Sequence, residues 1–456
     1  MHEFWRVENM KFTSSLSLLG KPVFGAQLLP IILVLLANLF LMNQSLAQIE
    51  LDVSGGEVRG IPTAIVPFKF IDGQSQAVNV ADIVNKNLSA TGKFDPINPQ
   101  RFLTQPSKID EVRYKDWRFI DAEVLVIGEV WKTAEDNYEI QFRMFDVARE
   151  QEVGTGKIIP NLRLSDLRAA AHLVSDEVYQ AFTGRPGAFN SRITYVKREQ
   201  IGFQQYQYKL FVADWDGFNA AEVYSSSQPL LSPTWSPDAR SIAFVAFSET
   251  GSLVQIIELI TGRTEVIASF KGINTAPAWS ADGSKLAYSS SKSGSPDVYV
   301  YSFATKQHER INSHYGIDTE PSWTPSGDGL LFTSSRSGKP QIYSYRFANK
   351  KIERVTFEGD DNANAAFDFD GERMVLVHEG GKIAVQKSSS GGLKLLTNAK
   401  FDESPSFSPN GDMVLYTASF DSGPALVVAS TDGRVKTRLE YVNGDVREPA
   451  WSPLKK

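Results

Sequence analysis

The chain carries few of the side chains that commonly do chemistry in enzymes. It has five histidines and no cysteine among 456 residues. Without cysteine, a thiol nucleophile, a thiolate-bound zinc ion and a disulfide are excluded. No metal-binding spacing such as H-E-x-x-H links the histidines, which are His2, His172, His308, His314 and His378. The sequence also lacks a G-x-S-x-G elbow and a glycine-rich phosphate loop, so we predict no catalytic residue, no metal and no cofactor.

Carboxylates are the remaining candidates for chemistry. Asp368-Phe369-Asp370-Gly371 resembles the start of a calcium-binding loop. The usual continuation is absent, because Glu379 is followed by two glycines, and we interpret these residues as a turn. Scattered aspartates and glutamates could still meet in a cavity, so an enzyme or a carbohydrate-binding protein is the alternative hypothesis. The formal net charge of −6 predicts no strong attraction to nucleic acid.

The remaining polar residues gather in short segments that each precede a recurring aromatic residue. The aromatic residue stands at 235, 279, 323, 367, 407 and 451, in steps of 44, 44, 44, 40 and 44. This period, with short strands and turn residues, is typical of a propeller blade of four strands. We interpret the polar segments as connections between the outer strand of one blade and the inner strand of the next. By ring symmetry they surround one mouth of the channel, where binding is commonly built, although ordinary solvated loops remain the alternative for any one residue.

The two ends of the repeat array predict how it closes. Five complete units run from about 228 to 445, and the unit at 360–399 is short. Residues 192–224 match the last three strands of a blade but lack the first strand, which carries the aromatic residue. Residues 446–453 supply such a first strand with no further strands after it. Joining the ends completes a sixth blade and removes free sheet edges. We therefore predict an all-β six-bladed propeller over 188–456, closed by pairing of its N- and C-terminal strands, with the aromatic residues in its core.

The segment before the repeats predicts a small α/β domain over 61–187. Apolar stretches at 63–68 and 122–130 indicate buried strands, and 138–146 with 151–159 indicate an antiparallel pair. Val80, Ile83, Val84 and Leu88 share one face of a helix that Gly92 closes. A second amphipathic helix runs from Leu167 to Phe182, with Ser165 as its expected N-cap and Gly184 at its end. The order of strand, helix, strands and helix is typical of an α/β fold.

The N-terminus predicts export. Residues 31–42 are almost entirely apolar, and Ser45-Leu46-Ala47 follows, so we predict a signal peptide over 1–47, counted from Met1 or Met10. The apolar run is too short for a membrane anchor, which needs about 20 residues. We therefore expect no membrane insertion of the mature chain.

Residues 48–60 form the expected flexible N-terminal interaction segment. Ile49, Leu51 and Val53 alternate with Glu50 and Asp52, which is the pattern of an amphipathic strand, and glycines follow. Such a strand could pair with the sheet edge of a partner. An ordinary first strand or a frayed terminus is the alternative.

The order of these parts resembles the TolB family, the periplasmic components of the Tol–Pal system of Gram-negative envelopes. The most specific stretches are Ile65-Val66-Pro67-Phe68, Ser175-Asp176-Glu177-Val178, Ser191 to Val196, Ser232 to Asp238, Thr319-Glu320-Pro321 and the end of the chain from Ser430 to Pro453. The resemblance implies a non-enzymatic adaptor in the periplasm. It would bind the lipoprotein Pal at one end of its channel and TolA through its mature N-terminus. Together these interactions would support outer-membrane integrity and constriction during cell division.

The resemblance also implies contact residues. At the propeller mouth they are Asn274, Ala276, Asp318, Thr319 and Glu320, and the corresponding segments of two other units add Glu403 and Arg447. The segment expected to bind TolA contains Ile49, Glu50, Leu51, Asp52 and Val53. The sequence departs from the family pattern at Ile273 and Thr275 and in the pair Gly55-Gly56. We expect a monomer that binds no nucleic acid.

Overall fold

The computed structural model describes residues 59–71, 78–134, 136–249, 251–388 and 391–454. The predicted signal peptide over 1–47 and the predicted TolA-binding residues Ile49 to Val53 lie outside these ranges. Within the described ranges, no helix is long and apolar enough to cross a membrane.

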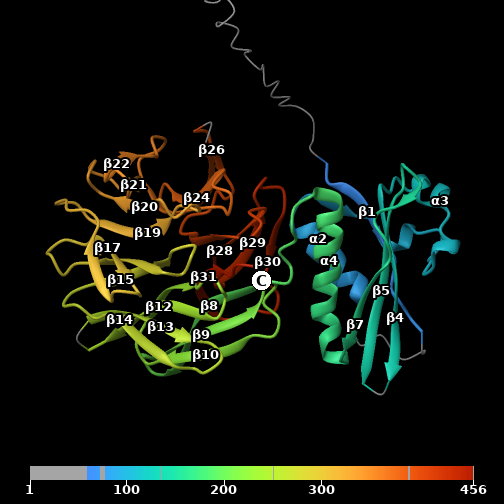
Figure 1. Ribbon diagram of the computed structural model, residues 1–456, viewed down its shortest axis with the longest axis horizontal. Coiled ribbons are helices and arrows are strands. Elements are labelled where there is room, and N and C mark those ends of the chain that lie inside the picture. The colour runs from blue at the N-terminus through green and yellow to red at the C-terminus, as the bar shows by residue number, and fades with distance from the viewer. Residues whose placement is uncertain (1–58, 72–77, 135, 250, 389–390, 455–456) are drawn as a thin grey trace, which may run out of the picture. The chain divides into compact units, whose positions relative to one another are not determined.

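The first part of the described chain is an α/β domain built on a seven-stranded sheet (Figure 1). The main strand order is β3-β1-β4-β5-β6, with β2 paired to β4 and β7 paired to β5. The strands are β1 Ile61–Ile65, β2 Lys69–Phe70, β3 Phe94–Pro96, β4 Val124–Ala134, β5 Asn137–Asp146, β6 Gln151–Glu152 and β7 Lys157–Leu162. The helices are α2 Val80–Ala90, α3 Tyr114–Phe119 and α4 Leu167–Thr183, with 3-10 turns at Pro99–Arg101, Ile109–Glu111 and Leu164–Asp166.

Both predicted helices are present, with one change at a cap. In α2 the predicted apolar face is buried, and the Asn79 side chain accepts a hydrogen bond from the backbone N–H of Asp82. Helix α4 ends as predicted at Gly184, which has the left-handed φ of 73°. Ser165 is not its N-cap. A 3-10 turn places Asp166 there, and its carboxylate accepts a hydrogen bond from the backbone N–H of Arg163 at 3.0 Å.

Six four-stranded sheets follow, and they form the predicted propeller (Figure 1). Blade 1 contains β11 Leu230–Trp235, β12 Ser241–Ser248, β13 Gly251–Glu258 and β14 Thr264–Ala268. Blade 2 contains β15 Asn274–Trp279, β16 Lys285–Ser290, β17 Asp297–Ser302 and β18 Gln307–Arg310. Blade 3 contains β19 Asp318–Trp323, β20 Gly329–Ser334, β21 Gln341–Arg346 and β22 Lys351–Arg354.

The remaining blades include the short unit and the closing blade. Blade 4 contains β23 Asn362–Phe367, β24 Arg373–His378, β25 Lys382–Lys387 and β26 Leu393–Leu395. Blade 5 contains β27 Glu403–Phe407, β28 Met413–Phe420, β29 Gly423–Ser430 and β30 Lys436–Arg438. Blade 6 joins β8 Arg192–Gly202, β9 Gln205–Asp214 and β10 Ala221–Ser226 to β31 Asp445–Trp451. The antiparallel pairing of β31 with β8 confirms closure by the terminal strands.

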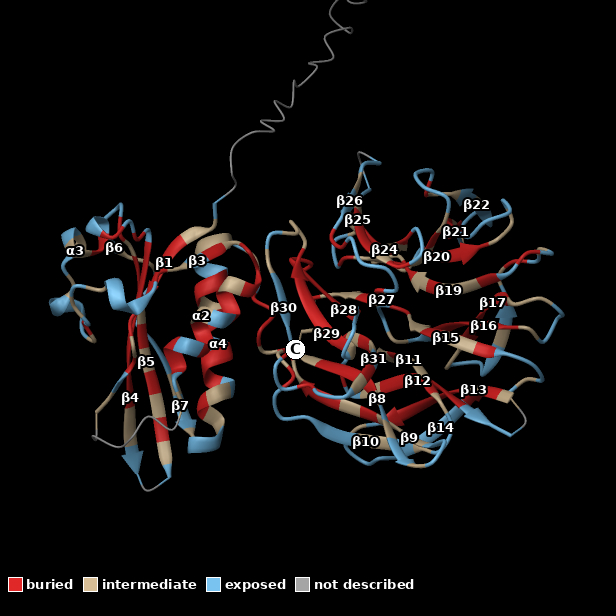
Figure 2. Ribbon diagram, turned by 180° about the vertical axis from the view of Figure 1, so that it is seen from behind, coloured by how far each residue is buried: buried red, intermediate tan, exposed pale blue. Residues whose placement is uncertain are grey.

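The recurring aromatic residues end the first strand of each blade and pack between blades, as predicted. Trp235, Trp323 and Trp451 are nearly fully buried in separate hydrophobic clusters. The outer strands β10, β14 and β22 are mainly exposed (Figure 2), which fits their polar sequences. The Asp368 to Gly371 segment is a turn, because the Asp368 carboxylate accepts hydrogen bonds from the backbone N–H and the Nε of Arg373.

The prediction of loops before the aromatic residues is wrong. These residues form the first strand of each blade. Each first strand contains a β-bulge, where its register with the second strand shifts. Bulges tolerate proline because one ladder hydrogen bond is already missing, and a proline lies inside the shifted region of every blade except blade 4, where Ala365 replaces it. The polar residues before each aromatic residue are therefore paired in a sheet, whereas the sequence suggested loops between blades.

Candidate functional site

The bulges build the wall of the propeller channel. In each blade one bulge residue has a left-handed φ between 48° and 54° and lines a cavity of about 420 Å³. These residues are Ser232, Ala276, Glu320, Asn364, Ser404 and Glu448. Their spacing repeats that of the aromatic residues, so one backbone feature places six equivalent side chains around the channel.

Two glutamates use this position to join neighbouring blades. Glu320 Oε2 accepts hydrogen bonds from Thr333 Oγ1 at 2.7 Å and from the backbone N–H of Asn364 at 2.9 Å. Glu448 Oε2 accepts one from the backbone N–H of Ser232 at 3.0 Å. The first set connects blade 3 to blade 4, and the second connects blade 6 to blade 1. These carboxylates therefore hold the inner strands of adjacent blades in register.

The channel is acidic, and this changes the titration of one group. Burial, together with the nearby charges of Glu403 and Glu320, raises the pKa of Glu448 to about 7, although its hydrogen bond from Ser232 acts in the opposite direction. The Arg447 guanidinium lies 3.8 Å from Glu403 Oε1 and supplies a compensating charge at the edge of the channel. The site can therefore bind a proton near neutral pH.

Two of the predicted contact residues are buried and serve a structural purpose. Asn274 has no exposed surface, and its Nδ2 donates to the carbonyl oxygens of Ser252 at 2.8 Å and Phe270 at 2.6 Å. Asp318 is equally buried, and its Oδ2 accepts hydrogen bonds from Asn312 Nδ2 and Arg336 Nη2. Burial raises the pKa of Asp318, and the hydrogen bonds to its carboxylate and the Arg336 charge oppose this rise. These side chains position the mouth and cannot touch a partner in this conformation.

The other predicted mouth residues are accessible. Ala276 and Glu320 are half-buried in the channel wall, and Thr319, directly before Glu320 in β19, is half-buried as well. The side chains of Glu403 and Arg447 are 43% and 47% exposed. The structure thus brings five of the seven predicted residues to one accessible end of the propeller.

Sequence reasoning missed an apolar component of this end. Ile273, Ile317 and Phe401, each directly before a buried polar residue, are 52%, 53% and 72% exposed. Phe247 and Phe420, on second strands, are exposed at the same end of the propeller. We call these five residues the apolar rim. An apolar residue one position before the buried Asn274, Asp318 and Asp402 was the available signal. Exposed apolar groups gathered on one face are typical of protein interaction sites.

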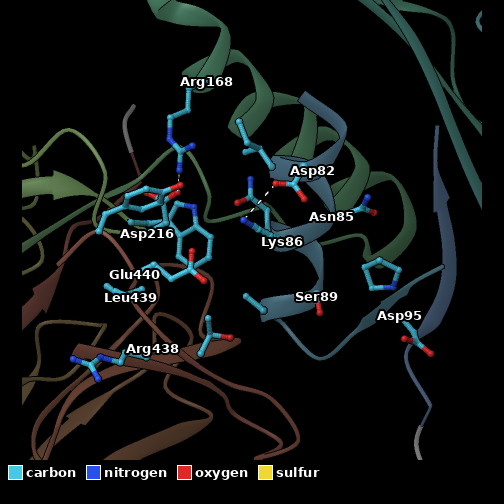
Figure 3. Close-up of a pocket in the computed structure, with 17 residues that line it drawn as sticks. Asp82, Asn85, Lys86, Ser89, Asp95, Arg168, Asp216, Arg438, Leu439 and Glu440 are labelled. Carbon is cyan, nitrogen blue, oxygen red and sulfur yellow. Dashed lines mark hydrogen bonds and ion pairs between the residues drawn. The ribbon is translucent and has the colours of Figure 1, made fainter. Parts of the chain in front are cut away.

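A second cavity lies between the α/β domain and the propeller. It has a volume of about 470 Å³ and is lined by α2, by Trp215 and Asp216 and by residues 437–441 (Figure 3). In Figure 3, Arg168 from α4 points at Asp216, with which it forms an ion pair, and Lys86 pairs with Asp82 at 3.3 Å. Its residues come from four separate parts of the chain, so no local pattern predicted it.

One group of metal-ligand type lies beside this cavity. Ligand atoms of His172, Asp214 and Asp216 lie within 4.8 Å of one another. His172 Nδ1 faces two N–H donors, Asn87 Nδ2 at 2.9 Å and Trp215 Nε1 at 3.4 Å. Because two donors converge on it, this nitrogen acts as an acceptor and the ring proton belongs on Nε2. With Arg168 paired to Asp216, the group forms a hydrogen-bonded domain contact.

The fold and the channel together define a closed six-bladed β-propeller protein with an N-terminal α/β domain. The family model of the TolB beta propeller domain matches residues 179–455, and that of the TolB amino-terminal domain matches residues 49–153. The chain therefore belongs to the TolB family.

Individual relatives agree with this assignment. The Tol-Pal system protein TolB of Nitrosococcus oceani is 50% identical over 89% of this chain and 94% of its own length. The protein of the same name from Xanthomonas oryzae pv. oryzae is 45% identical over 93% of this chain and 98% of its own length. The crystal structure of TolB from Acinetobacter baumannii has a TM-score of 0.79 and 38% identity, covering 87% of this chain and 97% of that one.

Proposed function

We propose that this protein is a non-enzymatic adaptor in the periplasm of a Gram-negative bacterium. Its propeller mouth binds Pal, and the segment that contains Ile49 to Val53 binds TolA. In this way it couples the outer membrane to an inner-membrane complex and supports outer-membrane integrity and constriction during division. Membership of the TolB family and the secretory pattern of residues 31–47 support this proposal.

The apolar rim is the single observation that carries the Pal site. It lies beside the acidic channel and its accessible side chains Thr319, Glu320, Glu403 and Arg447. An apolar centre with polar surroundings is the usual composition of a protein interface. Phe401 adds a large exposed aromatic side chain, and aromatic residues including Phe are enriched in the buried centre of interfaces.

Titration with the periplasmic domain of Pal tests this site. Phe401→Ala and Ile317→Ala should each weaken binding at least tenfold, equivalent to about 1.4 kcal/mol, while the melting temperature stays near that of the parent. Ile260→Ala is the matched control, because Ile260 is 82% exposed at the opposite end of blade 1. Unchanged Pal affinity in both mouth variants would remove the assignment.

The TolA site has an independent test. Deleting residues 48–58 should abolish TolA binding and leave both Pal affinity and the melting temperature nearly unchanged. A matched variant with Ile49, Leu51 and Val53 replaced by serine keeps the length of the segment but removes its apolar side. Unfolding of the deletion variant would instead make the segment structural.

The raised pKa of Glu448 gives the alternative function its one supporting observation, since perturbed carboxylates are common in enzymes. A channel enzyme or carbohydrate-binding site would need Glu448 with Glu403 or Glu320. The enzyme alternative would be favoured if the protein released sugar from peptidoglycan or oligosaccharides and Glu448→Gln abolished this release. Our proposal expects no such release.

A further inference from the structure

A groove between blades 3 and 4 marks a break in the internal repeat of the propeller. It has a volume of about 740 Å³. Leu331, Val355, Phe367 and Met374 line it, of which Leu331 and Met374 are only 1% and 2% exposed, and 72% of the surface of Phe357 is exposed. The groove is lined by residues of β20, β21, β23, β24 and β25 and by the segment that follows β22. Figure 2 labels β20, β21, β22, β24 and β25 near one another.

Other blades show what fills the corresponding space. We call the recurring aromatic residue at the end of the first strand of each blade its anchor. In blade 2, Phe303 stacks on the anchor Trp279 with ring centroids 5.2 Å apart. In blade 3, Phe347 stacks on Trp323 at 5.5 Å. In blade 6, Trp215 stacks on Trp451 at 6.1 Å. In three blades, therefore, the residue that follows the third strand supplies a ring that covers the anchor.

Blade 4 has serine at this position. The backbone N–H of Ser388 donates to the carbonyl oxygen of Glu372 at 2.8 Å, just as the N–H of Phe347 donates to that of Asp328 at 3.0 Å. The shared hydrogen bond shows that the two residues are structurally equivalent. Blade 4 therefore lacks the stacking ring, and its anchor is the smaller Phe367 instead of tryptophan.

In blades 1 and 5, which also lack that ring, a cation from the preceding blade covers the anchor. Arg192 lies 5.0 Å from the ring centre of Trp235 in blade 1, and Arg373 lies 6.0 Å from that of Phe407 in blade 5. The equivalent residue in blade 3 is Gly329, since its carbonyl accepts the same turn hydrogen bond as that of Arg373. Among the described residues, neither a ring contact nor a cation contact is formed by Phe367, and the other five anchors each have one.

We propose that the blade 3–4 groove is a binding site for an aromatic side chain of a partner polypeptide. In three other blades the fold places an aromatic ring at this position. An aromatic ring is therefore the group that fits the open position in blade 4. The aliphatic and thioether surfaces of Leu331, Val355 and Met374 suit a ring better than a charge. Charged side chains of both signs line the groove, with Arg346 and Lys387 beside Asp328 and Glu358. The charge of the groove therefore does not select the occupant. This site is separate from the channel mouth.

Blocked pentapeptides Gly-Ser-X-Ser-Gly, with X as Trp, Leu or Arg, test the proposal on the whole protein. The methyl signal of Met374 is the reporter, with Met144 and Met413 as internal references that lie outside the groove. The Trp peptide should bind with Kd on the order of 1 mM and shift only Met374 through the ring current. Equal or tighter binding of the Arg or Leu peptide would overturn the proposal. The proposal would also be overturned if free indole bound to the protein and the Trp peptide did not.

Variants at Ser388 decide whether the groove is the site. Ser388→Phe should restore the stack on Phe367 and weaken the Trp peptide at least tenfold. Ser388→Ala is the matched control, because it removes the hydroxyl but leaves the groove open, and it should bind as the parent does. Undiminished binding by a folded Ser388→Phe protein would contradict the assignment. Gly329 is unsuitable for this test, because an added Cβ would lie 2.5 Å from the carbonyl oxygen of Tyr345.

Discussion

The Tyr179 hydroxyl of α4 donates a hydrogen bond to Asp412 Oδ2 in blade 5. The other carboxylate oxygen faces Lys93 at 3.1 Å, Arg185 at 3.7 Å and Arg373 at 3.9 Å. Only 2% of the Asp412 side chain is exposed. Burial and the Asp412 charge raise the pKa of Tyr179, which keeps its hydroxyl protonated as a donor. One buried carboxylate thus joins both domains.

Replacing either partner should weaken the domain junction. Tyr179→Phe should lower the free energy of unfolding by about 1–3 kcal/mol, because a hydrogen bond to a buried charge is lost. Asp412→Ala should lower it by about 3 kcal/mol or more, because Lys93, Arg185 and Arg373 each lose a buried counter-charge. Denaturant unfolding measures both. Asp370→Asn is the control, since Asp370 also pairs with Arg185 but is 27% exposed, and a loss as large as that of Asp412→Ala would contradict the argument.

Glu448 should make the stability depend on pH. Its folded pKa of about 7 exceeds the ordinary 4.5, so the folded state binds more protons than the unfolded state between these values. Stability should therefore fall as the pH rises from about 4.5 to 7. Glu448→Gln keeps an acceptor for Ser232 and removes the titration. It should be more stable than the parent by up to roughly 3 kcal/mol at pH 8 and similar at pH 4.

The control for this titration is Glu358→Gln, an exposed glutamate outside the channel. It should leave the dependence of unfolding free energy on pH unchanged. Parallel curves for the parent and Glu448→Gln between pH 4 and 8 would show that Glu448 does not carry the effect.

The periodic parts of the fold could be predicted from sequence, and the rest depended on distant contacts. The anchors repeat, so the blades and their closure followed from counting Trp235 to Trp451. Residues 93–121 carry no such period, and β3, α3 and two 3-10 turns there were missed. Trp117 in α3 is 1% exposed, so tertiary burial defines this segment.

The candidate site was predicted in position but not in detail. The repeat located the mouth, because equivalent residues of a ring lie at one end. It could not separate buried Asn274 and Asp318 from accessible Thr319, since all are polar and precede an aromatic residue. Burial there depends on partners such as Phe270 and Arg336, which lie in other strands or connections.

Ring closure should depend more on Trp451 than the repeat suggests. The Trp451 indole N–H donates to Ser191 Oγ at 2.7 Å, whereas the buried N–H of Trp279 has no partner among the described residues. Trp451→Phe should lower the free energy of unfolding by about 1–2 kcal/mol more than Trp279→Phe, because only the first loses a hydrogen bond. Denaturant unfolding of both variants checks this. Equal losses would mean that ring volume alone decides stability.

Two adjacent glycines give a stringent test of how Phe401 is held at the mouth. Both have positive φ, 72° at Gly380 and 109° at Gly381. A Cβ at Gly380 would meet nothing within 4 Å, whereas one at Gly381 would lie 2.4 Å from the backbone nitrogen of Phe401. Gly380→Ala should therefore lower the unfolding free energy by only about 1 kcal/mol, from backbone strain. Gly381→Ala adds a backbone clash and should lower it by at least about 2 kcal/mol. The clash should also displace Phe401 and weaken the binding of any partner at that residue. Equal unfolding free energies for the two variants would show that the backbone at Phe401 moves easily to relieve the clash.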